Sequence, residues 1–330
     1  MVIKKVFSLM KLNCRTIVAL VASLATTVGS GKKPKPQGLY EKVSPACVEV
    51  LVGGRLDGSG AIVSTEGLVL TACHVIRKSS KRYEALTATA GRLPLKLLAT
   101  DRSLDLALLA LPKRAAPYPA LAFAKSIPPE GTRVYLFGSP VFRHRLLLNG
   151  SVAGRSSRYE WYDGAFTETY AIAGIGAGGS SGGPWLNGKG EIIGVQVASV
   201  AFGEKHQGVS SAIPVARVRE FALKRKTVTT ATLDGAVEEL WGQSPEYLAK
   251  VPPNLHGLVL RQVRKEGSAA KAGLKDEEIL LEVDGKKYER IEPFLKMVRS
   301  KRPGDELRLR VADKQGGNPR KVTIKLAELN

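Results

Sequence analysis

The sequence is poor in the residues that build metal centres and disulfide frameworks. Its 330 residues include three cysteines, Cys14, Cys47 and Cys73, and four histidines. Their spacing forms no metal-ligand cluster, so we expect neither a metal site nor a cofactor. An oxidising compartment would permit Cys47 and Cys73 to pair, but we expect two unpaired buried thiols.

The signatures of nucleic-acid binding are also missing, although the formal net charge is +20 and the isoelectric point is near 9.9. The basic residues are spread along the chain. No arginine-rich helix, zinc-finger spacing or stacking aromatic motif accompanies them. This favours a solvated basic surface over a nucleic-acid-binding protein, and we expect no nucleic-acid partner.

No acidic residue precedes Glu41, and the N-terminal apolar run is short. Basic residues precede this run, which covers 16–28, and small residues follow it. This is the order of a secretory signal, whereas a membrane span needs about 20 apolar residues. Residues 1–30 are therefore predicted as a signal peptide, or alternatively an inner-membrane anchor, of a secreted or periplasmic protein. A Pro/Lys-rich linker is predicted over 31–39.

Short apolar runs separated by glycine-rich turns follow. Eight of them are predicted strands, over 47–52, 60–63, 68–71, 93–99, 106–111, 133–137, 191–198 and 210–213, and a helix is predicted over 215–226. This density of short strands is typical of an antiparallel barrel or sandwich. A change of composition over 223–235 predicts a linker to a smaller unit, 236–330.

The run GAGGSSGGPW, residues 176–185, is the strongest candidate for chemistry. A nucleophile needs a tight turn, an uncrowded hydroxyl and free N–H groups near the developing oxyanion, and glycines supply all three. Ser181 is the candidate nucleophile, and the N–H groups of Gly179 and Ser181 are the candidate oxyanion hole. On its own, the run is also compatible with a flexible Gly/Ser loop.

A serine nucleophile requires a base, and the base requires an orienting carboxylate. His74 lies at the end of a predicted strand in LTACHVI, whereas the other histidines lie in polar or charged surroundings. Asp105 directly precedes an apolar strand, where it can be desolvated against an imidazole. Asp101 is expected to be a turn residue.

The motifs TACH at 71–74, DLALL at 105–109 and GSSGGP at 179–184 resemble, in this order, those of chymotrypsin-like serine proteases, and the best match is the HtrA/Deg family. The resemblance covers 40–222. It implies a mainly β fold, a chymotrypsin-like double antiparallel β-barrel with the catalytic triad His74, Asp105 and Ser181. It also implies a serine endopeptidase that acts on unfolded or damaged envelope proteins, as a homo-oligomer, a trimer by family analogy.

Ile175 stands where trypsin-like enzymes carry an aspartate, so no carboxylate is evident to hold a substrate Arg or Lys. Val195, Gln196 and Val197 are expected to pair with substrate and to line the specificity pocket. We therefore expect cleavage after small or medium apolar residues. The alternative is that Ile175 is simply a core residue.

Residues 256–288 resemble a PDZ domain, which implies a small α+β unit that binds C-terminal peptides. Leu240, Trp241 and Gly242 are the candidate carboxylate-binding loop. The alternative is a PDZ-like spacer without a peptide groove. For the whole chain, the alternative function is a protease-fold binding or chaperone protein with little turnover.

Overall fold

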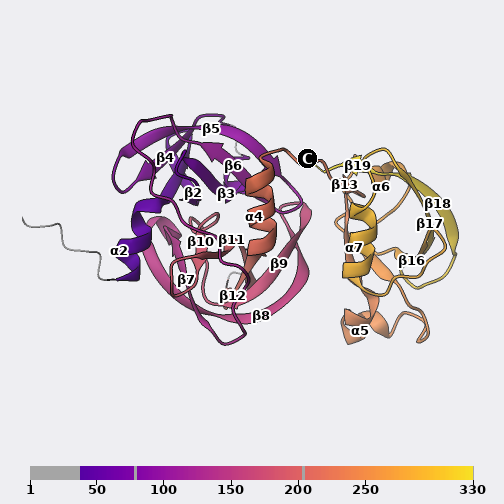
Figure 1. Cartoon of the computed structure of the whole chain (residues 1–330). Coiled ribbons are helices and arrows are strands. Elements are labelled where there is room, and N and C mark those ends of the chain that lie inside the picture. Colours follow the sequence, from indigo (N-terminus) through magenta and orange to yellow (C-terminus); the bar gives the residue numbers. More distant parts are fainter. Residues whose placement is uncertain (1–37, 78–79, 203–204, 330) are drawn as a thin grey trace, which may run out of the picture. The chain divides into compact units, whose positions relative to one another are not determined.

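The computed structural model describes residues 38–77, 80–202 and 205–329. The predicted signal peptide or anchor, Cys14 and nearly all of the 31–39 linker lie outside the described residues. Within the described part, no helix combines the length and apolarity needed to cross a membrane. The description begins at a short helix, α2 (Leu39–Val43), and a 3-10 turn, η1 (Ser44–Ala46), which lead into the first strand (Figure 1).

Six antiparallel strands close the first barrel in the order β1-β2-β3-β6-β5-β4. They are β1 (Cys47–Val52), β2 (Arg55–Ile62), β3 (Leu68–Ala72), β4 (Tyr83–Thr87), β5 (Gly91–Asp101) and β6 (Leu106–Ala110). Every residue of β1 and β3 is buried, which explains why both strands are apolar apart from Glu49 in β1 and Thr71 in β3. A short helix, α3 (Cys73–Ile76), follows β3 directly.

The second barrel has the order β10-β11-β12-β9-β8-β7. Its strands are β7 (Arg133–Gly138), β8 (Leu146–Tyr162), β9 (Ala165–Ala173), β10 (Pro184–Leu186), β11 (Ile192–Phe202) and β12 (Lys205–Pro214). A 3-10 turn, η2 (Pro140–Phe142), follows β7, and helix α4 (Val215–Lys224) follows β12 and ends where Arg225 adopts a left-handed conformation. One apolar core contains side chains from both barrels, including Leu70, Leu108 and Ile213.

The barrels include four strands that the sequence patterns did not predict: β4, β8, β9 and β10. The β8–β9 hairpin turns at Asp163 and Gly164, whose φ angles are +50° and +76°. Asp-Gly with two positive φ angles is the signature of a two-residue hairpin turn. This dipeptide was therefore the signal that could have found the hairpin.

A third unit follows. Its five-stranded sheet has the order β14-β15-β16-β17-β18, and a separate pair joins β13 to β19. The strands are β13 (Ala231–Thr232), β14 (Ala236–Glu239), β15 (Leu258–Arg261), β16 (Ile279–Val283), β17 (Glu306–Ala312), β18 (Arg320–Lys325) and β19 (Ala327–Glu328). Its helical segments are η3 (Leu240–Gly242), α5 (Pro245–Leu248), α6 (Ser268–Lys271) and α7 (Ile291–Arg299). This sheet has its own apolar core, which includes Phe294 and Leu307.

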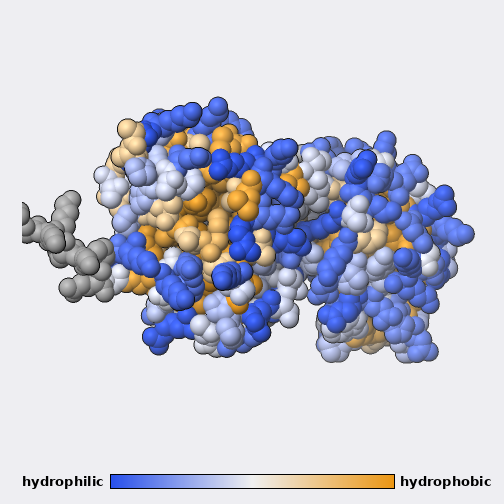
Figure 2. All heavy atoms as spheres, in the orientation of Figure 1, coloured by the Kyte–Doolittle hydropathy of each residue, from blue (hydrophilic) through white to orange (hydrophobic). Residues whose placement is uncertain are grey.

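Two closed barrels followed by a small α+β unit confirm the predicted fold class. On the face drawn in Figure 2, hydrophilic side chains cover most of the surface, and hydrophobic ones gather over the middle of the barrel region. The blue surface agrees with a mostly hydrophilic, solvated exterior on this face.

Candidate active site

His74 and Asp105 lie in direct contact. β3 delivers His74 at the start of α3, and Asp105 precedes β6, which pairs with β3. The ring Nδ1 of His74 lies 2.6 Å from Asp105 Oδ2, and the main-chain N–H of His74 donates to Asp105 Oδ1 over 2.8 Å. The carboxylate therefore holds both the position of the helix turn and the orientation of the imidazole. This leaves Nε2 as the nitrogen available for proton transfer.

The backbone conformation of Asp105 orients its carboxylate. Asp105 is completely buried and adopts φ +52°, a left-handed conformation that aspartate tolerates better than most residues. Its carbonyl accepts a 2.9 Å hydrogen bond from the N–H of Cys73. Burial, and then the neighbouring Asp105 charge, raise the pKa of the Cys73 thiol to about 12. The thiol next to the site is thus kept as an uncharged packing group.

The turn that carries Ser181 packs on the end of β3, two residues before the histidine. A β-carbon at Gly182 would lie 2.1 Å from Thr71 Oγ1 and 2.7 Å from the nitrogen of Ala72. The carbonyl of Ser181 accepts a 2.8 Å hydrogen bond from the N–H of Ser59 on β2. The structure therefore brings the Ser181 backbone to the strand that delivers His74. The Ser181 hydroxyl and the imidazole form no hydrogen bond among the described residues, and such bonds are often long without substrate.

The two N–H groups of the candidate oxyanion hole are available. Neither Gly179 nor Ser181 donates a main-chain hydrogen bond to another described residue. Gly179 adopts φ +94°, and Ser180 closes the loop by donating from its hydroxyl to the carbonyl of Ala177. Ser180 is therefore a structural spacer. The loop can present both N–H groups to a developing negative charge.

The predicted specificity residues separate into two groups. The side chain of Ile175 is 59% exposed, so it is not a core residue. Val195, Gln196 and Val197 are all buried, and the Gln196 amide contacts Trp185 Nε1 over 2.7 Å. β10 pairs with β11 only as far as Val195. Gln196 still exchanges main-chain hydrogen bonds with Gly182 and Gly183, so the edge of β11 that remains open for a substrate strand begins at Val197, the last residue of the predicted segment.

The β8–β9 hairpin adds residues that the sequence patterns missed. The ring of Tyr162 meets that of His74 edge-on, with centroids 5.1 Å apart. Beside it, Asp163 forms ion pairs with Arg77 at 2.7 Å and with Arg102 at 3.2 Å. Burial and the nearby Asp105 charge raise the pKa of Tyr162. The hairpin tip therefore bounds His74, the candidate catalytic histidine, on one side.

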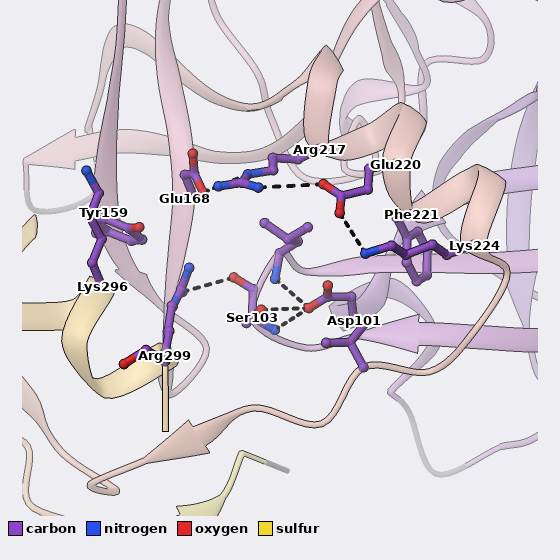
Figure 3. A pocket seen from close by; sticks show the side chains of 13 residues that line it. Asp101, Ser103, Tyr159, Glu168, Arg217, Glu220, Phe221, Lys224, Lys296 and Arg299 are labelled. Atoms are coloured by element: carbon purple, nitrogen blue, oxygen red, sulfur yellow. Dashed lines mark hydrogen bonds and ion pairs between the residues drawn. The ribbon is translucent and has the colours of Figure 1, made fainter. Parts of the chain in front are cut away.

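A pocket of about 390 Å³ is lined by Asp101 and Ser103 of the turn that precedes Asp105, and by residues of α4 and α7 (Figure 3). Asp101 accepts hydrogen bonds there from the N–H and hydroxyl of Ser103, which agrees with the expected turn role, and burial raises its pKa. Arg299 from α7 donates to the carbonyls of Ser103, at 3.1 Å, and Phe166, at 2.5 Å. Four of the lining residues pair with one another: Glu168, Arg217, Glu220 and Lys224.

The predicted carboxylate-binding residues, Leu240, Trp241 and Gly242, form η3 at the end of β14. Trp241 donates from Nε1 to the carbonyl of Glu289, while Leu240 is buried. The pocket at the other end of β14 is lined by Leu233 and Gly235, among others, and has a volume of only about 30 Å³.

Two family models match the chain. The first describes a trypsin-like peptidase domain and covers residues 58–195, and the second describes a PDZ domain and covers residues 228–326. The chain is 26% identical to serine protease HTRA1 of Xenopus tropicalis over 75% of its length, and 28% identical to a probable periplasmic serine endoprotease DegP-like of Pseudomonas fulva over 81%. These matches confirm the predicted resemblance. The chain spans 58% and 55% of these relatives' lengths.

Solved structures show the same fold. An HtrA-type protease AlgW with decapeptide aligns with a TM-score of 0.60 at 19% identity, covering 89% of this chain and 98% of that one. A serine endoprotease from Yersinia pestis aligns with a TM-score of 0.59 at 21% identity, covering 91% and 100%. Both alignments extend over the barrels and the C-terminal unit together.

Proposed function

We propose that the chain is a serine endopeptidase. It joins a trypsin-like peptidase domain to a PDZ domain and is related to the HtrA-type serine proteases. The observation that carries the proposal is the contact of His74 with a fully buried Asp105, beside the glycine-rich turn of Ser181. For the domain bounds we propose 40–222 for the peptidase domain, 223–235 for the linker and 236–330 for the PDZ-like domain; the PDZ family match begins earlier, at residue 228, and β13 at the end of the linker pairs with β19 of the PDZ-like domain.

In this mechanism Ser181 attacks the scissile carbonyl while His74 Nε2 takes its proton. Asp105 holds the imidazole tautomer and stabilises the imidazolium. The N–H groups of Gly179 and Ser181 donate hydrogen bonds to the oxyanion of the tetrahedral intermediate. The imidazolium then protonates the leaving amine, and water hydrolyses the acyl-enzyme to release the second product.

The test compares the wild-type chain with Ser181→Ala on denatured casein and with a fluorophosphonate probe. We expect cleavage and probe labelling with the wild type and neither with the variant. Cleavage at equal rates by both proteins would refute the assigned nucleophile. Complete inertness of the wild type towards both reagents would favour the binding or chaperone alternative.

For specificity, we propose cleavage after small or medium apolar residues. Ile175 brings no carboxylate to the pocket wall, and the open edge of β11 beyond Gln196 can pair with an extended substrate. A peptide library digested with the full chain tests this preference. Preferred cleavage after Arg or Lys would contradict it.

We also propose that the chain is exported through residues 1–30 and acts on unfolded or damaged envelope proteins, as a homo-oligomer. The signal-like order of its N-terminal residues supports export, and one relative is named as probably periplasmic. Fractionation of cells that express the full chain, followed by N-terminal sequencing, tests both export and cleavage of the signal.

The PDZ domain is proposed to bind C-terminal peptides by adding them as a strand. β14 pairs only with β15, so its second edge is open on the side of α7. Phe166 of the β8–β9 hairpin packs in the same apolar cluster as α7, and the pocket there is too small for a side chain. Peptide entry at that point therefore requires Phe166 to move. Titration with peptides ending in apolar residues, on wild type and Phe166→Ala, measures this requirement.

A further inference from the structure

The two peptide groups that flank Gly179 are each held by a hydrogen bond to their carbonyl oxygen. The carbonyl of Gly178 accepts a 2.7 Å hydrogen bond from the N–H of Val141, and that of Gly179 accepts one of 2.8 Å from the hydroxyl of Ser59. In a planar trans peptide, the N–H points away from the carbonyl of the preceding residue. Fixing the Gly178 carbonyl therefore fixes where the Gly179 N–H, the candidate oxyanion donor, points.

Ser139 positions both of these hydrogen-bond donors, the N–H of Val141 and the hydroxyl of Ser59. It is 1% exposed, and its N–H donates to the Ser59 hydroxyl over 3.1 Å. Its own hydroxyl accepts from the N–H of Arg145 over 2.9 Å, which closes the turn that carries Val141. A β-carbon at Gly179 would lie 2.4 Å from the Ser139 carbonyl oxygen, so the oxyanion loop rests directly on this residue.

The Ser139 hydroxyl donates its hydrogen bond to the carboxylate of Glu49. This carboxylate belongs to β1 in the other barrel and is 2% exposed. Its Oε1 lies 2.5 Å from the Ser139 hydroxyl and 2.7 Å from Nδ1 of His144, a largely exposed side chain. A buried carboxylate is costly unless it is hydrogen-bonded, and bonds to such a group are short and strong. Glu49 therefore ties the Ser139 turn to the first barrel.

We propose that Glu49 and Ser139 are positioning residues for the oxyanion hole: they touch no substrate, but they orient the Gly179 N–H through Val141 and Ser59. The proposal rests on the proposed peptidase activity. It predicts that loosening this network impairs the transition state more than substrate binding. The Michaelis complex depends on the open edge of β11, which the network does not contact.

The chain contains a matched control. Glu168 on β9 is also a buried carboxylate, and it accepts a 3.0 Å hydrogen bond from the hydroxyl of Ser157 and pairs with Arg217 at 3.1 Å. Glu168→Ala and Ser157→Ala thus remove the same chemistry, a carboxylate and a donating hydroxyl, at a place that does not contact the oxyanion loop.

The experiment measures kcat and KM on an activated peptide substrate, and the inhibition constant of a peptide boronate, for Glu49→Ala, Glu49→Gln, Ser139→Ala and the two controls. Full removal of one oxyanion donor costs about 10²–10³-fold in kcat, and a misdirected donor should cost less. We expect Glu49→Ala and Ser139→Ala to lower kcat by roughly 10–100-fold, with KM changed less than about threefold. Boronate affinity should fall by a similar factor.

Glu49→Gln keeps an oxygen that can accept from the Ser139 hydroxyl, so it should recover most of the kcat. The controls should melt at lower temperature yet keep the wild-type kcat when folded. Unchanged kcat in Ser139→Ala, which loses a single atom, would overturn the proposal, as would equal losses in the Glu168 and Ser157 controls. An inert wild type would instead refute the peptidase function itself, so the two failures are distinguishable.

Discussion

Gly182 gives the sharpest test of how the nucleophile turn is built. It adopts φ +81°, and an added β-carbon would lie 2.1 Å from Thr71 Oγ1 and 2.3 Å from the carbonyl oxygen of Ser59. Alanine in the left-handed region costs about 1–2 kcal/mol, and an extra methyl group in a close-packed site costs about 1–3 kcal/mol. We therefore expect Gly182→Ala to lower the free energy of unfolding by roughly 2–5 kcal/mol, the sum of these two terms.

The same substitution should also reduce activity. The clash is relieved only if the turn moves away from β3, and a displacement of about 1 Å at a catalytic group costs roughly 10²-fold in rate. Gly178 in the same loop is the control, because its added β-carbon would meet nothing within 4 Å. Gly178→Ala should keep nearly all of the stability.

Urea unfolding followed by tryptophan fluorescence, together with peptide hydrolysis, measures both effects. Equal unfolding midpoints and equal rates for Gly182→Ala and the wild type would refute the packing argument. A loss in Gly178→Ala as large as that in Gly182→Ala would show that chain flexibility, not contact with β3, explains the glycines of this loop.

Three further outcomes follow from the site. Asp105→Asn should lower kcat by roughly 10⁴-fold while His74 stays in place, because the amide no longer favours the required imidazole tautomer, and wild-type kcat would exclude Asp105 from the triad. Cys73 should resist alkylation by iodoacetamide at pH 8 until urea unfolds the chain. The reason is that a pKa raised from 9.0 to about 12 lowers the thiolate fraction about a thousandfold. Rapid alkylation of Cys73 in the native protein, detected by mass spectrometry, would contradict this. Trp185→Phe leaves the buried Gln196 amide oxygen without its 2.7 Å donor, and should cost about 1–3 kcal/mol in a urea titration.

The sequence alone was enough to predict the mainly β class and to single out His74, Asp105 and Ser181. This was possible because each motif demands particular residue types at fixed spacing: glycines around a serine, and a histidine or aspartate next to an apolar strand. The apolar runs of β1, β3 and β6, interrupted only by Glu49 and Thr71, agree with strands that are almost entirely buried. These are local properties, and they can be read from neighbouring residues.

The β8–β9 hairpin escaped prediction for a physical reason. Most residues of β8 are exposed or half-buried, so the strand lacks the apolar run by which the other strands were found. Only the Asp163-Gly164 turn carried a clear signal. The sequence led us to expect substrate pairing over residues 195–197, but where the open edge of β11 begins depends on where β10 stops pairing rather than on the sequence of β11.

What the tertiary structure alone decided is how the oxyanion loop is held. Ser139 and Glu49 are 90 positions apart, and Ser59 and Gly179 are 120 apart, yet each pair is joined by a hydrogen bond. No local pattern marks such partners, because a serine or a glutamate has the same sequence signature whether it is solvated or paired. Short sequence motifs identify the residue types that catalysis needs. The alignment of these residues arises only when the two closed barrels bring distant hydrogen-bond donors and acceptors together.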